Sequence, residues 1–371
     1  MKDTDDNSTK SSGQLGDESA RAPALAEPLL VYGSYGQTGR LVAKCAIARG
    51  HEVLLSGAGR DRLDRQAAEI GARSTVAKLD DAFGLRQLVR NAGCVIHAAG
   101  PFIDTFRPML EACIAENVPY VDLNGEWEVF RAIEELMGRR QPDIPVVSGV
   151  GFGVAAGESV ALYAVGKLLT TERIWLGLAP DLGQRSRGAL RSLLQTVSRG
   201  GMAVHNGRHI TERVGRRSFR ATLARRRRTF VSMPLGELWA VHRSTGVANI
   251  IGGVAVPAAE RILLRSGLLG WLGRSPTMRE WFVKRLAQDP GPGTPAFESA
   301  VWARAEDREG GVSDAILTMG EGYLWSAEAA VRAAERIIIH RRPGLWTPGQ
   351  YFGKEFAASV SGTQLLQHTG S

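Results

Sequence analysis

The chain contains little cysteine, and its cysteines are not arranged to bind a metal ion. Among 371 residues there are three, Cys45, Cys94 and Cys113, with no CxxC spacing and no histidine motif beside them. Structural disulfides belong to oxidising compartments, and metal sites need ligands at set spacings. We therefore predict no metal site and a reduced intracellular location, the cytoplasm.

Long apolar runs are missing as well. Residues 1–27 are polar and contain no apolar signal core, so we expect a disordered tail and no secretion. No apolar run reaches the roughly 18 residues that would span a membrane. The nearest segment, residues 247–273, is interrupted by Pro257 and Glu260. Core or dimer packing, an apolar pocket and a peripheral membrane contact all remain open for it.

Short apolar runs alternate with amphipathic stretches in the first part of the chain. The runs predict strands at residues 28–32, 52–57, 74–80, 94–100, 120–125 and 144–151. Runs that are apolar throughout indicate a parallel sheet covered by helices on both faces. The predicted fold class is α/β, with a Rossmann doubly wound parallel sheet and a second α+β domain. The expected boundaries are 28–151 for the first domain, 152–325 for the second, and 326–371 for a C-terminal helix and tail.

The turn after the first predicted strand carries three glycines at spacings of three. It has the sequence VYGSYGQTGR, with Gly33, Gly36 and Gly39 between an apolar run and a helical stretch. In a Rossmann domain such glycines permit a tight turn, the approach of a pyrophosphate and close packing of helix on sheet. The positive end of the helix then favours the phosphates. We predict a dinucleotide site here, with Arg40 near the phosphates.

The second strand indicates which dinucleotide binds. NAD-binding domains place an acidic residue at its tip, about 20 residues past the glycines, to bind the ribose 2′-hydroxyl. Here the segment SGAGR ends in Arg60, whose guanidinium suits a 2′-phosphate, with Arg62 and Arg65 nearby. We predict NADP rather than NAD. The adjacent Asp61 is the one feature that favours NAD.

Several of these segments together resemble one known family. YGSYGQTGRLV, SGAGR, AAGPF (98–102), YVDLNGE (120–126) and GLWTPGQYFG are similar to the saccharopine dehydrogenase-like oxidoreductases, which include trans-acting enoyl reductases. The resemblance covers roughly residues 28–356 and implies a Rossmann domain that binds NADP, a second domain for substrate and dimer contacts, and a C-terminal helix that packs back on the first domain. Carried over by position, it assigns the cofactor to Ser34, Tyr35, Gly36, Gln37, Thr38, Arg60, Asp80, Ala99 and Gly100, and we add Pro101.

The chain departs from the family after the sixth strand. A Gly-Phe stretch followed by Pro and Asp is frequent there, whereas this chain has GVGFGVAAGES, with alanines and Glu158. The departure leaves the substrate open, because saccharopine recognition cannot be matched residue by residue.

No proton donor stands out among the candidate catalytic residues. Tyr163 and Lys167 have the YxxxK spacing of short-chain dehydrogenases, which would place them on one helical face. In that family, however, the helix comes one element earlier, so a packed tyrosine is favoured. Asp122, near the tip of the fifth strand, is the other weak candidate. His97 lies inside the fourth strand and is predicted to be a buried core histidine.

The substrate is expected at the carboxyl ends of the fourth and fifth strands. The residues that we predict to face it are Phe102, Arg107, Asp122 and Glu126. The function predicted from the sequence is NADP-dependent reduction of a C=C (enoyl) or C=N (imine) bond of a biosynthetic intermediate. A non-catalytic NADP-binding partner protein and a carbonyl reductase that uses Tyr163 remain alternatives.

The net charge of +8 is concentrated around the arginine run 225–228. The run lacks interleaved aromatic residues, so we predict no nucleic acid partner. A solvated hairpin and a docking site for an acidic carrier protein or a phosphorylated acyl carrier both remain open. The expected partners are therefore a small-molecule or carrier-bound acyl substrate and a second copy of the chain in a homodimer.

Overall fold

The computed structural model describes most of the chain. The described residues are 27–180, 201–223, 226–256, 275–286 and 299–370, together with residues 197 and 261. Nearly all of the predicted disordered tail lies outside them. So do residues 257–260 and 262–273 of the apolar segment, and Arg225 of the arginine run.

The first sheet contains seven parallel strands among the described residues. Their order is β15 (Gly344–Trp346), β6 (Pro145–Val147), β5 (Tyr120–Asp122), β4 (Cys94–His97), β1 (Leu29–Tyr32), β2 (Val53–Gly57) and β3 (Arg73–Val76). The predicted doubly wound sheet is confirmed, and the strand order reverses between β1 and β4. Such a switch point creates a crevice at the carboxyl ends of the strands.

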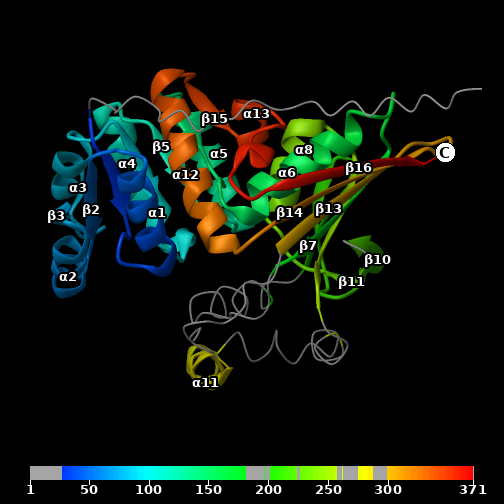
Figure 1. Ribbon diagram of the computed structural model, residues 1–371, viewed down its shortest axis with the longest axis horizontal. Helices are drawn as coiled ribbons and strands as arrows, with labels where there is room; N and C mark the ends of the chain where they lie inside the picture. The colour runs from blue at the N-terminus through cyan, green and yellow to red at the C-terminus, as the bar shows by residue number, and fades with distance from the viewer. Residues whose placement is uncertain are drawn as a thin grey trace, which may run out of the picture.

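Helices cover both faces of this sheet, as Figure 1 shows. They are α1 (Gln37–Ala48), α2 (Arg60–Ile70), α3 (Ala82–Val89), α4 (Phe102–Glu116) and α5 (Trp127–Arg140). Leu29 and Val31 pack with α1 and α2, whereas Leu30 and Tyr32 pack with α3, α4 and α5. Because successive side chains of a strand point to opposite faces, both faces must be apolar.

The second domain is built on a mixed sheet of nine strands within the described residues. They are β7 (Arg173–Ala179), β8 (Gly201–His205), β9 (Arg208–Glu212), β10 (Ser218–Leu223), β11 (Arg226–Ser232), β12 (Asn249–Ala255), β13 (Ser299–Glu306), β14 (Val312–Met319) and β16 (Gln364–Gly370). Only the β12–β7 pair is parallel; the other described pairs are antiparallel. The predicted second α+β domain is therefore confirmed. Helix α8 (Glu237–Thr245) precedes β12, and α11 (Pro276–Leu286) lies below the sheet in Figure 1.

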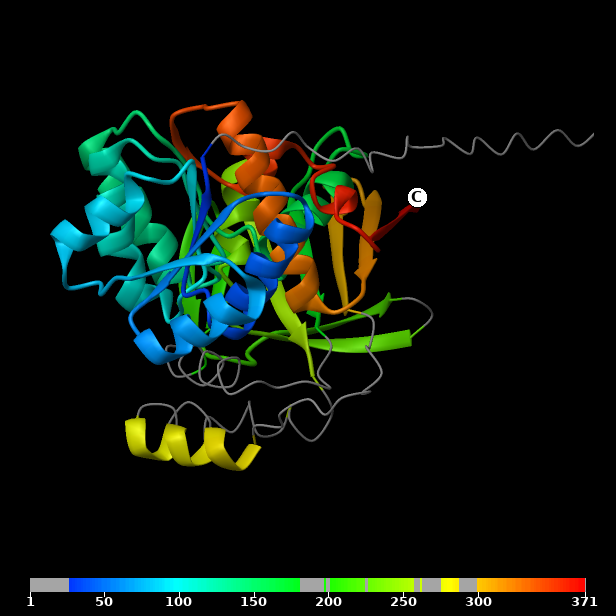
Figure 2. The same ribbon diagram turned by 60° about the vertical axis from the view of Figure 1, so that its left-hand side comes forward.

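Two helices join the domains. Helix α6 (Phe152–Val165) leaves β6 and packs on β7, β13 and β14 of the second sheet. Helix α12 (Gly322–Ile339) follows β14 and lies beside α1, as Figure 2 shows. The chain then adds β15 to the first sheet and continues through α13 (Pro348–Phe352) and the 3-10 turn η1 (Ala357–Ser359). It ends in β16 on the second sheet, so the segment after α12 ties both domains together.

Charged groups hold α12 against the first domain. The carboxylate of Glu335 accepts hydrogen bonds from Arg49 Nε at 2.8 Å and Nη2 at 2.7 Å, and it lies 2.6 Å from His51 Nε2. Burial alone would raise the pKa of Glu335, but the bonds from His51 and Arg49 outweigh it and lower the pKa to about 2.

Among the described helices, none combines the length and the apolar character that a membrane span would need.

We expect Glu335→Gln to destabilise the protein by about 1.5–3 kcal/mol at pH 7, because it removes the charge from these hydrogen bonds. A depressed pKa stabilises the fold above the ordinary glutamate value of 4.5, and this contribution is lost as the pH falls towards 2. Urea unfolding should therefore show a difference from wild type that shrinks over that range. The control is Glu69→Gln, whose exposed pair with Lys44 should contribute little to stability because solvent screens it. Equal losses for the two variants would contradict the assignment.

Candidate functional site

The glycine turn after β1 is held against the turn after β4. Gly33 has φ +81°, and a Cβ placed on it would lie 2.7 Å from the Cβ of Ala99. A Cβ on Gly39 would lie 2.3 Å from the carbonyl oxygen of Gly33. Glycine is thus required at position 33 by the left-handed backbone and by the contact with Ala99. At position 39 it is required by the packing of α1 on the turn. These are the roles that the sequence predicted for the first and third glycines.

The helices that begin at the carboxyl ends of the strands differ in whether their first N–H groups already have side-chain acceptors. The α4 N-terminus is neutralised, because Glu126 accepts from Phe102 N at 2.8 Å and from Ile103 N at 3.1 Å. The first N–H of α6, from Phe152, donates to Ser326 Oγ at 2.9 Å. Helix α1 has no side-chain cap at Gly36 and no acidic residue in its first turn. Its N–H groups therefore remain available for an anion such as a pyrophosphate.

The side chains of the turn after β1 support it rather than face a ligand. Ser34 is fully buried, and its hydroxyl donates to Gln66 Oε1 at 2.8 Å. The Tyr35 hydroxyl accepts from Gly59 N at 3.0 Å. The Nε of Arg40 donates to the carbonyl of Tyr35 at 3.2 Å. The sequence predicts all three as cofactor contacts. The backbone of Ser34 is engaged as well, because its N–H donates to the carbonyl of Ser56 at 3.1 Å and its carbonyl accepts from Gln66 Nε2 at 2.9 Å. Gln37 is exposed and Thr38 partly exposed at the start of α1.

Arg60 is the first residue of α2, and its side chain is exposed. No other described residue forms a hydrogen bond or ion pair with its guanidinium. A cation at a helix N-terminus opposes the helix dipole, so local structure does not explain this arginine. Its neighbour Arg62 instead lies 4.3 Å from the ring centroid of Tyr35. Asp61 is exposed in the first turn of α2.

The turns after β3 and β4 complete the floor of the crevice. Asp80 is exposed, and Asp81 caps α3 by accepting from Gly84 N at 2.9 Å. After β4, Thr105 Oγ1 donates to the carbonyl of Ala99 at 2.5 Å. This turn contains a cis peptide bond between Gly100 and Pro101. Gly100 is exposed, which leaves its backbone accessible to a ligand.

Asp122, a weak candidate for catalysis, is fully buried. Its carboxylate accepts from Gly149 N at 2.8 Å, Ser148 Oγ at 2.8 Å and Asn124 N at 3.0 Å. Burial raises its pKa to about 6, partly offset by these bonds. Asp122 thus joins the ends of β5 and β6, and its carboxylate is occupied by hydrogen bonds from the chain itself. His97 is also fully buried: its Nδ1 lies 2.9 Å from the Tyr120 hydroxyl, and burial lowers its pKa to about 3.

The structure does not form the predicted Tyr163–Lys167 pair. Helix α6 ends at Val165, so Lys167 lies beyond it and does not share its face with Tyr163. The ring of Tyr163 instead has Lys354 Nζ at 5.1 Å from its centroid. Tyr163 is 11 residues past Phe152, about 16 Å along the helix from the crevice edge. This geometry does not favour the carbonyl reductase alternative.

The predicted substrate residues around α4 are mostly engaged elsewhere. Glu126 caps α4, as described above. Arg107 is exposed and lies 3.7 Å from Glu111 one helical turn away. Phe102 is partly exposed, with its ring 5.4 Å from that of His97. Phe102 and Glu126 are both partly exposed next to the turn after β4, but the carboxylate of Glu126 already accepts two backbone N–H groups.

Sequence reasoning missed Glu237, the first residue of α8. It is 7% exposed and lies where the second domain meets the ends of β5 and β6. A Cβ on Gly236 would lie 2.5 Å from the carbonyl oxygen of Gly125, and one on Gly153 would lie 2.0 Å from Glu237 Oε1. The signal was present in the departure GVGFGVAAGES, because Gly153 and Gly157 form a small-residue face on α6. Nothing in the sequence indicated which side chain would occupy it.

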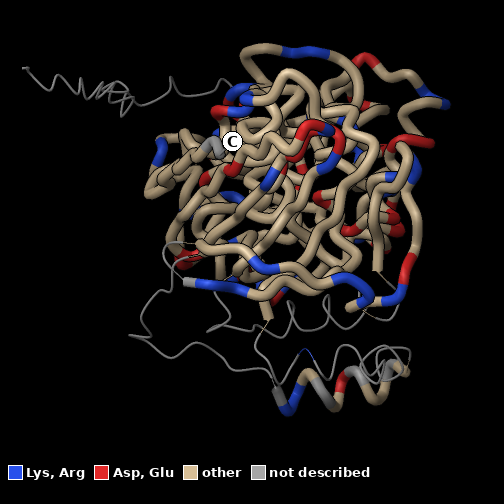
Figure 3. The backbone as a smooth tube through the Cα atoms, turned by 90° about the vertical axis from the view of Figure 1, so that its right-hand side faces the viewer, with Lys and Arg blue, Asp and Glu red and all other residues tan. Residues whose placement is uncertain are grey.

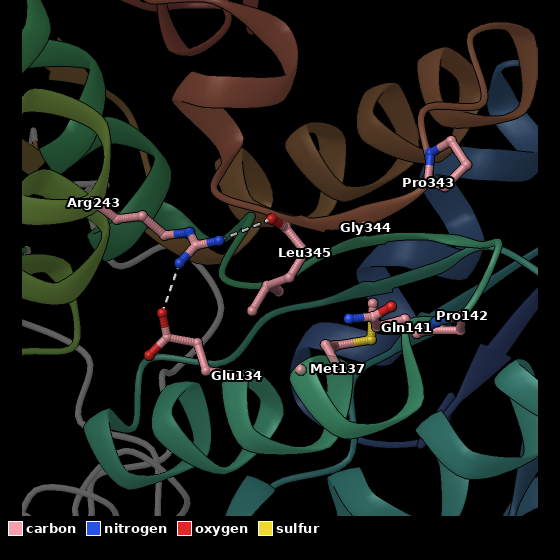
Figure 4. Close-up of a pocket in the computed structure, with 9 residues that line it drawn as sticks. Glu134, Met137, Gln141, Pro142, Arg243, Pro343, Gly344 and Leu345 are labelled. Atoms are coloured by element: carbon pink, nitrogen blue, oxygen red, sulfur yellow. Dashed lines mark hydrogen bonds and ion pairs between the residues drawn. The ribbon is translucent and has the colours of Figure 1, made fainter.

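A pocket of about 540 Å³ lies at the opposite end of the first sheet. It is lined by Gln141 and Pro142, which precede β6, and by Pro343 and Gly344 at the start of β15. Figure 4 shows Arg243 of α8 reaching Glu134 of α5, at 2.6 Å, and the carbonyl of Leu345. These contacts fasten α8 to the first domain. The pocket is remote from the glycine turn and is not part of the predicted site.

The comparisons with known proteins agree with this geometry. Residues 29–142 match the family model of the saccharopine dehydrogenase NADP binding domain. The structure is similar to apo saccharopine dehydrogenase (L-Glu forming) from Saccharomyces cerevisiae, with a TM-score of 0.64, 12% identity, and coverage of 93% of this chain and all of that one. No curated protein matches the chain.

More distant structures share only part of the fold. Yeast methylglyoxal/isovaleraldehyde reductase with NADPH matches 26% of this chain and 36% of its own, at 12% identity and a TM-score of 0.24. Vestitone reductase from alfalfa matches 33% of this chain and 55% of its own, at 13% identity and a TM-score of 0.28. Their similarity is too weak to carry an argument.

The predicted resemblance is confirmed: residues 29–142 match the saccharopine dehydrogenase NADP-binding domain, and the fold of the chain is similar to that of a saccharopine dehydrogenase. Because the matched family is an NADP-binding domain, the predicted cofactor is confirmed as well. The individual cofactor and substrate residues, and the enoyl reductase subtype, stay predictions.

We expect Gly33→Ala to be far more damaging than Gly50→Ala. Both glycines have a left-handed backbone, at φ +81° and +88°, but nothing lies within 4 Å of a Cβ on Gly50. Strain should cost each variant about 1–2 kcal/mol. The contact with Ala99 should cost Gly33→Ala about 1–3 kcal/mol more. Chemical unfolding measures both variants, and equal losses would show that the two turns are not in close contact.

Proposed function

We propose that the chain is an NADPH-dependent reductase that acts on a C=C or C=N bond of a biosynthetic intermediate. The observation that carries the proposal is the uncapped N-terminus of α1, which follows the glycine turn at the switch point of the sheet. An anion is favoured at this position, because the first N–H groups of the helix have no side-chain acceptor. When bound there, NADPH supplies the hydride, and the chain supplies position and a proton.

The residues that would hold the cofactor follow from the strand order. The backbone N–H groups of residues 37–39 would bind the pyrophosphate, because they begin an uncapped helix. Arg60 at the tip of β2 would bind the 2′-phosphate, and the exposed backbone at Gly100 would border the nicotinamide half. The adenosine half would then lie over β1–β3 and the reacting half over β4–β6.

The positive charge of the second domain supports the proposal that the substrate is larger than a free metabolite. The hairpin β10–β11 carries Arg220, Arg227 and Arg228 with exposed side chains. Figure 3, seen from the side of the second sheet, shows Lys and Arg along its lower edge, where this hairpin lies in Figure 1. An acidic carrier protein that presents an acyl chain has the complementary charge. We therefore extend the proposal to a carrier-bound acyl substrate, and to a homodimer by analogy with the family.

A non-catalytic NADP-binding protein is the alternative from another class. It predicts the same cofactor site, but it needs no proton donor in the crevice. Cofactor binding alone cannot separate the two functions, whereas turnover can.

We expect the protein to bind NADPH more tightly than NADH and Arg60→Ala to remove most of this preference. Loss of a charge-assisted bond to a phosphate should weaken NADPH binding roughly 10–100-fold and leave NADH binding nearly unchanged. Titration of cofactor fluorescence measures both affinities. The control is Arg73→Ala, an exposed arginine at the start of β3 that pairs with Glu52 at 2.6 Å. An unchanged NADPH preference in Arg60→Ala would refute the assignment.

We expect NADPH oxidation, followed by absorbance, with at least one class of substrate from a panel of 2-enoyl thioesters and cyclic imines. The free thioester, the coenzyme A ester and the carrier-bound ester should be compared, because the exposed arginines favour the last two. Tight NADPH binding without turnover across the panel would support the non-catalytic alternative. Absence of NADPH binding would overturn the proposed function itself.

A further inference from the structure

Glu237 is a buried carboxyl group at the reacting end of the crevice. It begins α8 in the second domain, and its neighbour Gly236 touches the backbone of Gly125 just after β5. Its Oε1 lies against Gly153 in the first turn of α6, just after β6. The carboxyl ends of β5 and β6 hold the reacting half of a dinucleotide in this fold. Glu237 therefore brings a titratable group of the second domain to that half.

Two glycines of α6, one helical turn apart, face the side chain of Glu237. A Cβ on Gly153 would lie 2.0 Å from Glu237 Oε1, so Gly153 leaves the space that the carboxyl group occupies. A Cβ on Gly157 would lie 3.4 Å from the Cγ of Glu237, in van der Waals contact with the same side chain. The carboxyl group of Glu237 therefore packs against the first turn of α6.

Unlike the other buried carboxyl groups near the site, Glu237 has no hydrogen-bond partner on another residue in the part of the chain that the structure describes. Glu158 accepts from Thr347 Oγ1 and from Gly349 N, the latter at 2.7 Å, and Asp122 is bonded by the turn after β6. No other described residue donates a hydrogen bond to Glu237. Burial raises its pKa to about 7, and its own backbone N–H is the only group that offsets this. An acid with such a pKa is suited to proton transfer near neutral pH.

Aromatic and imidazole groups lie at the same boundary. Trp127, which begins α5 just after the β5 turn, has its ring 4.4 Å from that of His209 on β9. His209 in turn lies 4.9 Å from His242 on α8, and its Nε2 is buried without a partner among the described residues. An unpaired polar atom and an aromatic face are features of a site for an organic substrate.

We infer that Glu237 donates the proton that completes reduction of the substrate double bond. The inference rests on the proposed function. The reduction adds a hydride and a proton: the hydride of NADPH joins one atom of the double bond, and the proton of the Glu237 carboxyl group joins the other. The π bond is consumed, NADPH leaves as NADP⁺, and the Glu237 carboxylate regains a proton from water. Atoms and charge balance without another reactant.

The surrounding titratable groups do not replace Glu237 in this role. On the elements packed around it they are Glu126, Glu134, Glu158, His205, His209, His242 and Arg243. Glu126 and Glu158 are hydrogen-bonded to helix starts, and Glu134 pairs with Arg243. His205 is exposed at the end of β8. Burial lowers the pKa of His209 to about 4 and also lowers that of His242, so both are neutral near pH 7.

The test measures the dissociation constants of NADP⁺ and NADPH from pH 5.5 to 8.5 and needs no substrate. The oxidised nicotinamide ring carries a positive charge that the reduced ring lacks, so an ionised Glu237 should favour NADP⁺. We expect the ratio of the NADP⁺ to the NADPH dissociation constant to fall about tenfold as the pH rises through 7. The 2′-phosphate titrates in both forms, so its contribution cancels in the ratio.

Glu237→Gln should remove this pH dependence while NADPH still binds, with melting temperature as the check of folding. Glu158→Gln is the matched control, because its carboxyl group is equally buried and has a pKa raised to about 7, yet it is bonded to α13. It should keep the pH dependence.

Three results would overturn the inference: a flat ratio in the wild type, a wild-type slope in Glu237→Gln, or loss of the slope in Glu158→Gln alone. The flat wild-type ratio needs no variant, so the inference remains testable if Glu237→Gln does not fold. In each case NADPH still binds, whereas failure of the wild type to bind NADPH overturns the proposed function instead.

Discussion

The backbone after β1 passes in contact with the turn after β4, and the candidate site depends on this approach. Gly33 makes it possible, because any side chain there would meet Ala99. The approach brings the N-terminus of α1 to the switch point of the sheet, where the strand order reverses. The same turn is fixed from the other side by Ser34 and Gln66. A rigid turn keeps the helix N–H groups directed at one place, which a bound anion requires.

Sequence patterns predicted the elements whose periodicity is local. The first six strands were found because each is followed by a helical stretch and because all except β3, at the edge of the sheet, are largely apolar. Strand β15 was missed, since its three residues follow a stretch of turn-forming residues and pair with a strand nearly 200 positions earlier. The C-terminal segment was expected to pack on the first domain, and α12 lies against α1. Its last strand, β16, instead joins the second sheet, a long-range pairing that local sequence cannot indicate.

The candidate site shows the same division between local and long-range information. The role of Gly39 follows from the motif, because Gly39 packs on the backbone of Gly33 within the same turn. The motif also predicts the tight turn at Gly33, but the contact of Gly33 with Ala99 is long-range. The side chains of Asp122 and Glu126 were expected to face a substrate. Both instead serve as acceptors for backbone N–H groups, of Gly149 and Phe102 respectively. Sequence places a carboxyl group at a strand end, but it does not show which N–H groups come within 3 Å of it.

Satisfaction of hydrogen bonds separates the structural acids from the functional candidate. Asp122 and Glu158 are fully buried, and each receives donors from a neighbouring loop, so burial raises the pKa without leaving the group unpaired. Each therefore fastens one segment to another. Glu237 is similarly buried, yet it receives no such donor from another described residue, and Gly153 of α6 leaves room for it. A fold that leaves a carboxyl group unpaired loses stability, because burial without partners is unfavourable. Retaining Glu237 at the domain boundary is therefore better explained by what the crevice binds than by how the chain folds.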